Sequence, residues 1–140
     1  MQHDDRPLLR VPTPSGLTLE FKRSFPYGPD DPYVGGMVMR ATGGGVSVEH
    51  EVLLGGSRDL VGFFHAMYDD FRGWTGERVW QSLESELRIS ARHDGHVHLR
   101  WDLTNAPYER EHSWSFAVTT QHGAGEDVRR LADGFHHLLA

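Results

Sequence analysis

Apolar and polar residues alternate along several segments of this chain, which is the spacing typical of half-buried β-strands. In the clearest segment, residues 83–92, small and apolar side chains alternate with charged and polar ones. Asp94-Gly95 follows this segment and Gly43-Gly44-Gly45 follows another, and both favour tight hairpin turns. The alternation predicts six strands, at residues 17–22, 33–41, 46–53, 83–92, 96–103 and 114–118.

Two segments have the spacing of amphipathic helices instead. In residues 57–72, Leu60, Phe64 and Met67 recur at intervals of four and three, and Gly73 provides a stop. After Gly125, apolar side chains at positions 128, 131, 132, 135, 138 and 139 form one stripe that continues to residue 140. Each helix therefore has one apolar face that must pack against another element.

This order of elements predicts an α+β fold, written βββα-βββα. Packing both helices against a single sheet buries both stripes, so we predict a two-layer sandwich with a six-stranded, mainly antiparallel sheet and two helices on one face. Residues 1–16 contain three prolines and are expected to form an irregular N-terminal arm before a single domain at residues 17–140. The free face of the sheet would carry Glu49, Glu51, Glu84, Glu86, Arg88, Arg92, His96, His98, Arg100 and Asp102.

Composition excludes several classes of protein. The chain has 140 residues, enough for one domain, and its lack of Cys excludes disulfides, thiolate nucleophiles and Cys-ligated metals. The net charge is −6 and the basic residues form no cluster, so we expect no nucleic-acid partner. No apolar run is long enough for a membrane span or a signal peptide, so we expect no membrane association and a cytoplasmic location.

Histidines suggest one candidate metal site. His96 and His98 lie two residues apart on a predicted strand, so both rings share a face and could ligate one ion, with Asp94 or another histidine completing the set. The alternative is that these histidines are solvated side chains of a polar hairpin. No recognised metal-binding motif accompanies the pair.

Catalytic motifs are absent from the sequence. It contains no GxSxG or SxxK motif, and its Ser, His and Asp residues form no recognisable catalytic set. We therefore expect no cofactor and favour a protein that is not an enzyme.

The segment around the end of the first helix is the candidate binding site. Asp69 and Asp70 place negative charge at the carboxyl end of that helix, where the helix dipole makes each unfavourable by about 0.3 to 1 kcal/mol. Trp74, Arg78 and Trp80 follow in a connection, and aromatic and Arg side chains are enriched in protein interfaces. The alternative is that both indoles fold inward to close the end of the core while the acids pair with arginine.

The segment GWTGERVWQSLESELRISARHDGHVHLR, residues 73–100, resembles the central part of a family of small actinobacterial proteins of unknown function. That family is in turn similar to WapI-type immunity proteins of bacterial toxin systems. The resemblance implies an α+β binding domain and, beyond that, neutralisation of a partner toxin. We therefore predict non-enzymatic binding of a protein partner. The alternatives are a small-ligand or metal-dependent enzyme using His96 and His98, and a homo-oligomer formed through an edge strand or the free sheet face.

Overall fold

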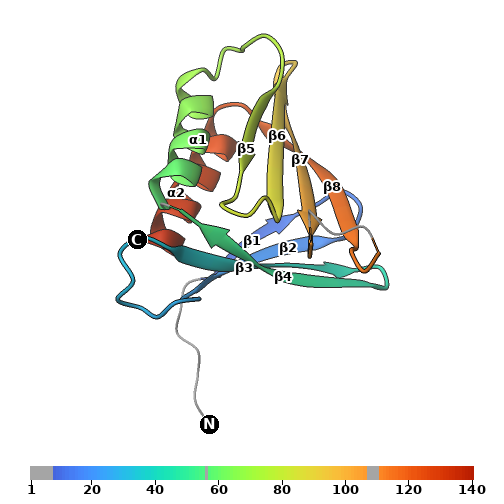
Figure 1. The fold of residues 1–140 in the computed structure, drawn as a ribbon. Helices are drawn as coiled ribbons and strands as arrows, with labels where there is room; N and C mark the ends of the chain where they lie inside the picture. Colours follow the sequence, from blue (N-terminus) through green and yellow to red (C-terminus); the bar gives the residue numbers. More distant parts are fainter. Residues whose placement is uncertain (1–7, 56, 107–110) are drawn as a thin grey trace.

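The computed structural model describes residues 8–55, 57–106 and 111–140, which form two antiparallel sheets and two helices (Figure 1). Sheet A contains β1 (Leu8–Pro12), β2 (Thr18–Ser24), β3 (Gly35–Gly43) and β4 (Val46–Leu54). Sheet B contains β5 (Arg78–Gln81), β6 (Leu87–His93), β7 (His96–Thr104) and β8 (Ser115–Gly123). Helix α1 (Ser57–Asp69) connects the two sheets, and α2 (Glu126–Leu139) follows sheet B.

Each sheet is a meander in which strands that are neighbours in the sequence are paired. The hairpins predicted at Gly43–Gly45 and at Asp94-Gly95 are confirmed, since β3 pairs with β4 and β6 with β7. Glycine is required at the second turn because Gly95 has φ +104°, a conformation that L side chains rarely adopt.

The hydrophobic core lies where the two sheets and the two helices meet. Figure 1 shows the sheets at an angle to one another, with the helices filling the open side between them. One fully buried aromatic ring comes from each of four elements: Phe21 of β2, Phe64 of α1, Trp101 of β7 and Phe135 of α2. Phe64 and Phe135 stack with ring centroids 5.0 Å apart, and Phe21 lies 5.3 Å from Trp101. Both halves of the chain therefore share one core.

The predicted single six-stranded sheet is wrong, although the fold is α+β. The structure has two separate four-stranded sheets, with the order ββββα-ββββα. A strand occupies about 4.8 Å of sheet width and a helix about 10 Å, so two helices cover only about four strands. Because both sheets have an apolar inner face, each sheet must cover part of the other.

Two strands lie where the sequence indicated irregular structure. Strand β1 lies within residues 1–16, and β5 lies within the predicted connection that contains Trp74, Arg78 and Trp80. Both are short edge strands of four or five residues, and a period of two is hard to recognise over so few positions. Strand β6 begins at Leu87 rather than at residue 83, because the chain turns at Ser85 with φ 60°.

The hydrogen bonds of Glu86 account for that turn. They also correct the prediction that Glu86 lies on the free face of a sheet. Its side chain is only 5% exposed, not on a free surface. The carboxylate accepts hydrogen bonds from the backbone N–H of Leu53 at 2.9 Å, from the Ser82 hydroxyl and from the backbone N–H of Glu84. Glu86 therefore links β4 of sheet A to the start of sheet B.

The outer faces of the sheets are polar. Across sheet A, Arg10, Glu20, Arg40 and Glu49 form one row in which charges alternate from β1 to β4. On sheet B, Arg100 donates to both carboxylate oxygens of Asp102 at 3.1 Å. Neither helix in the described part of the chain is long and apolar enough to cross a membrane.

Candidate functional site

The α1–β5 connection, residues 70–77, begins where α1 ends. The backbone N–H of Gly73 donates to the carbonyl oxygen of Asp70 at 2.9 Å and closes a turn. Gly73 has φ +133°, and a side chain there would face the ring of His93 on β6. His93 holds the turn in place, because its Nε2 donates to the carbonyl oxygen of Phe71 at 2.8 Å while its Nδ1 accepts from Gly95.

Three of the five predicted binding residues meet here, two from the connection and one from the start of β5. The Arg78 guanidinium lies 4.5 Å from the centre of the Trp74 ring and pairs with Asp70 at 2.5 Å. Arg78 also donates to the carbonyl oxygen of Ala66, near the end of α1, at 3.3 Å. Trp74 packs edge-to-face against His93, with centroids 5.1 Å apart. The charge of Asp70, unfavourable for the helix dipole, is thus compensated by Arg78.

The other two predicted binding residues are not among the side chains that make these contacts. Trp80 is on β5 opposite Ile89, half-buried against the core. Asp69 is exposed and has no ion pair within the described residues. The role of these five residues in binding stays a prediction.

His96 and His98 share the outer face of β7, as their spacing predicts. The Nε2 of His98 lies 2.7 Å from the Oδ1 of Asp94, and this hydrogen bond is the largest of the effects that lower the pKa of Asp94. His98 therefore already has a hydrogen-bond partner within the β6–β7 hairpin. Within residues 8–55, 57–106 and 111–140, no three His, Asp or Glu side chains come together as they would around a metal ion.

The β2–β3 loop, residues 25–34, is a candidate contact surface that was not among the predicted sites. Tyr33 and Val34 were predicted to begin a strand, but β3 begins at Gly35. The side chains of the loop include Tyr27, which is 64% exposed, and Tyr33, which is 79% exposed. Phe25 at its start is 40% exposed and lies under the guanidinium of Arg23. The sequence contained one sign of this surface. The segment places three aromatic residues among prolines and aspartates and lacks the apolar periodicity that would bury them.

The backbone of this loop is held by its own hydrogen bonds. The Oδ1 of Asp31 accepts from the backbone N–H groups of Tyr33 and Val34, both at 2.8 Å. Both hydrogen bonds lower the pKa of Asp31, and the bond from Val34 has the larger effect. At the root of the loop, Arg23 donates to the carbonyl oxygens of Leu139 and Ala140. The tyrosines are therefore presented on an ordered backbone.

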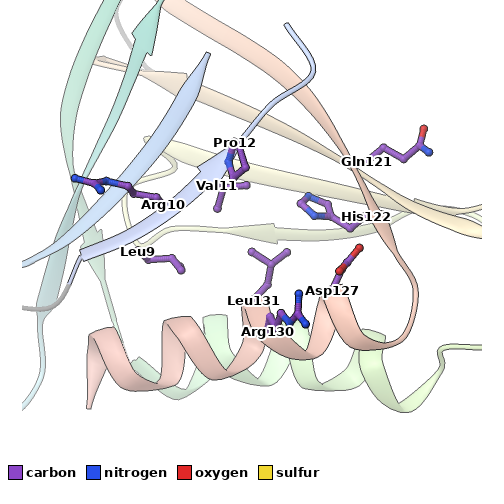
Figure 2. A pocket seen from close by; sticks show the side chains of 9 residues that line it. All are labelled: Leu9, Arg10, Val11, Pro12, Gln121, His122, Asp127, Arg130 and Leu131. Carbon is purple, nitrogen blue, oxygen red and sulfur yellow. The ribbon is translucent and has the colours of Figure 1, made fainter. Parts of the chain in front are cut away.

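A pocket of about 360 Å³ lies between β1, β8 and α2 (Figure 2). Figure 2 shows His122, Asp127 and Leu131 facing the pocket, whereas Arg10 and Gln121 point away from it. The lining residues are Leu9, Arg10, Val11, Pro12, Gln121, His122, Asp127, Arg130 and Leu131.

His122 connects this pocket to the core. Its Nε2 lies 2.7 Å from the Oγ1 of Thr120, and that same oxygen accepts from the indole N–H of Trp101 at 2.9 Å. Burial lowers the pKa of His122, and the nearby Asp127 carboxylate opposes that effect more weakly. His122 was not among the predicted site residues. It lies two residues after Thr120 on the inward face of β8, beyond residue 118 where the predicted strand ended, so the periodicity did not mark it.

In the described part of the chain, these contacts define an α+β protein with a shared core, two aromatic loops and a polar pocket between β1, β8 and α2. The chain belongs to DUF6228, a family of unknown function whose model matches residues 10–140. This match confirms the resemblance to a domain family of unknown function, and it begins within β1. No curated protein and no solved structure matches the chain.

Proposed function

We propose that this protein acts by binding a protein partner through the β2–β3 loop. The observation that carries the proposal is the exposure of Tyr27 and Tyr33 on a loop whose backbone is already held by Asp31. Tyrosine provides a large, rigid contact area at low entropic cost, which is why binding loops are rich in it. A loop ordered before binding also loses little conformational freedom in the complex.

Charge indicates the kind of partner surface. The loop carries Asp30 and Asp31 and no basic residue, and the whole chain has a net charge of −6. An acidic surface accelerates association with a basic partner at low salt. The complementary partner therefore has a basic surface with room for two tyrosine rings.

The partner we propose is a toxin, which would make this chain an immunity protein. This step rests on the resemblance proposed from residues 73–100 to small proteins that are in turn similar to WapI-type immunity proteins. The family match at residues 10–140 adds no function to it. Immunity proteins act by covering a partner and require no catalytic group of their own. The α1–β5 connection, with Asp69, Asp70, Trp74, Arg78 and Trp80, is the second candidate for the contact.

The test begins with the genes on either side of this one: a toxin domain encoded there is expected, and its absence would count against the immunity role. The chain is then co-expressed with that toxin domain. Growth should be rescued by the native chain, and the purified proteins should form a complex. Tyr27→Ser together with Tyr33→Ser should weaken the complex by about thirtyfold or more, the effect of removing an anchor worth about 2 kcal/mol. The melting temperature of the free protein should not change.

Matched variants separate the two candidate surfaces. Val46→Ser removes an apolar side chain that is 36% exposed on the β3–β4 hairpin, and it should not affect rescue. Phe71→Ser removes an apolar side chain that is 46% exposed within the connection. If Phe71→Ser abolishes rescue and the tyrosine variants do not, the contact moves to the connection. If the native chain neither rescues growth nor binds the toxin, the immunity role is rejected.

A further inference from the structure

We propose that the pocket between β1, β8 and α2 binds a free α-amino acid with an apolar side chain. The pocket offers a carboxylate, a guanidinium, a neutral hydrogen-bond donor and an apolar wall. These four features match the ammonium group, the carboxylate and the side chain of such a ligand. The site is separate from the β2–β3 loop and does not depend on the function proposed above.

His122 supplies the neutral donor. The indole N–H of Trp101 can only donate, so Thr120 Oγ1 accepts from it and directs its own proton to His122 Nε2. Within the described residues the Thr120 hydroxyl has no third partner. Nε2 is therefore an acceptor, and Nδ1 carries the proton of the neutral ring. Because Nε2 is hydrogen-bonded to Thr120, only the N–H at Nδ1 is left for the pocket. His122 therefore acts toward the pocket as a donor and not as a general base.

Asp127 and Arg130 supply the two charges. They lie three residues apart on α2, a spacing at which opposite charges readily pair. Glu126 and Arg129, with the same spacing on the same helix, do pair, at 2.5 Å. No ion pair joins Asp127 to Arg130 in the described structure. Asp127 uses Oδ2 to accept from the Gly123 backbone N–H at 2.9 Å, which leaves Oδ1 for a ligand.

Apart from Arg10 and Gln121, which point away, the remaining lining residues are apolar. Val11 and Leu131, which are 3% and 6% exposed, lie on opposite sides, and Leu9 and Pro12 extend this wall. Arg10 points away from the pocket and pairs with Glu20 at 3.4 Å. The charges left to a ligand are those of Asp127 and Arg130, which cancel when His122 is neutral. A zwitterion satisfies both charges, whereas a simple anion would meet Asp127 and a simple cation would meet Arg130.

The experiment is an NMR titration of the full chain with three probes of the same size class. L-Leucine carries both charges, N-acetyl-L-leucine lacks the ammonium group, and L-leucinamide lacks the carboxylate. At about 10 mM, which saturates a millimolar site, leucine should shift the signals of His122, Asp127 and Arg130. Each blocked probe should bind at least about tenfold more weakly, a loss of about 1.4 kcal/mol.

Variants of α2 provide matched controls. Asp127→Asn keeps an oxygen for Gly123 but removes the charge, so it should weaken leucine and not N-acetyl-leucine. Arg130→Gln should weaken leucine and not leucinamide. Glu126→Gln and Arg129→Gln change the neighbouring pair at the same spacing, and they should leave leucine binding unchanged.

Three results would overturn the proposal. The first is the absence of any shift in the pocket signals with leucine at about 10 mM. The second is equal binding of all three probes, which would mean that only the apolar wall is recognised. The third is an equal loss of binding in the control variants. The ¹⁵N shifts of His122 also test the donor assignment, since a proton on Nε2 would contradict it.

Discussion

The α1–β5 connection and the β2–β3 loop have similar compositions, but the Trp74 side chain of the connection packs inward and the two tyrosines of the loop face outward. Both join two elements, both contain glycine, and both have aromatic and acidic residues. In the connection, Trp74 is half-buried beneath Arg78 and beside His93. In the loop, Tyr27 and Tyr33 project outward. The two segments lie at opposite ends of the helical layer (Figure 1).

The difference shows that partners elsewhere in the fold decide whether an aromatic loop folds inward. The connection has an arginine from β5, a histidine from β6 and the end of α1 within reach. The β2–β3 loop uses its hydrogen bonds to fix its own backbone and to hold the end of α2. An aromatic side chain without such neighbours stays on the surface, where it is available to a partner.

The largest expected effect is on stability, and it compares one aromatic residue from each region. Trp74→Ala should reduce the free energy of unfolding by about 3 kcal/mol, because the indole packs against the core. Tyr33→Ala should change it by less than about 0.5 kcal/mol, because the ring is exposed. Urea denaturation of both variants measures this. Equal losses would remove the distinction between the regions.

A smaller effect should come from Arg78, whose side chain is 31% exposed. Arg78→Ala should reduce the free energy of unfolding by about 1 kcal/mol, since it removes the contact with Trp74 and the pair with Asp70. Arg72→Ala is the matched control, because its guanidinium lies 5.6 Å over the exposed ring of Phe71. If the two variants lose the same stability, the contacts of Arg78 with Trp74 and Asp70 add nothing to the free energy of unfolding.

The smallest effect concerns the backbone of the β2–β3 loop and depends on pH. Hydrogen bonds from Val34 and Tyr33 hold the pKa of Asp31 below its ordinary value of 3.8. Because the folded-state pKa is lowered, the stabilisation is present above the ordinary value and is lost as the pH falls through the folded-state pKa. An NMR titration should place the Asp31 midpoint below 3.8, with the Tyr33 and Val34 amide signals changing at the same pH.

Asp31→Ala tests the same bonds without acid. The variant should exchange the amide hydrogens of Tyr33 and Val34 faster than the native chain at neutral pH. Unchanged exchange would show that the loop is held by something other than Asp31.

The candidate sites were only partly predictable. Asp70 was recognisable because its charge is unfavourable at a helix end, and its partner Arg78 was in the predicted set. His122 could not be ranked above the other histidines, since its importance comes from the Thr120 hydroxyl and the Trp101 indole. Trp101 is 19 residues away from that hydroxyl in the sequence, and only strand pairing brings them together.

Local patterns by themselves determined both helices and the approximate positions of six strands, because periods of two and about 3.6 are set by backbone geometry. Tertiary structure decided that eight strands form two sheets, because this depends on how much apolar surface two helices can cover. It also decided that Glu86 is buried between the sheets, since only the assembled fold brings the N–H of Leu53 to its carboxylate. A period of two places a side chain on one face of a strand, and the element that packs against that face determines whether it is buried.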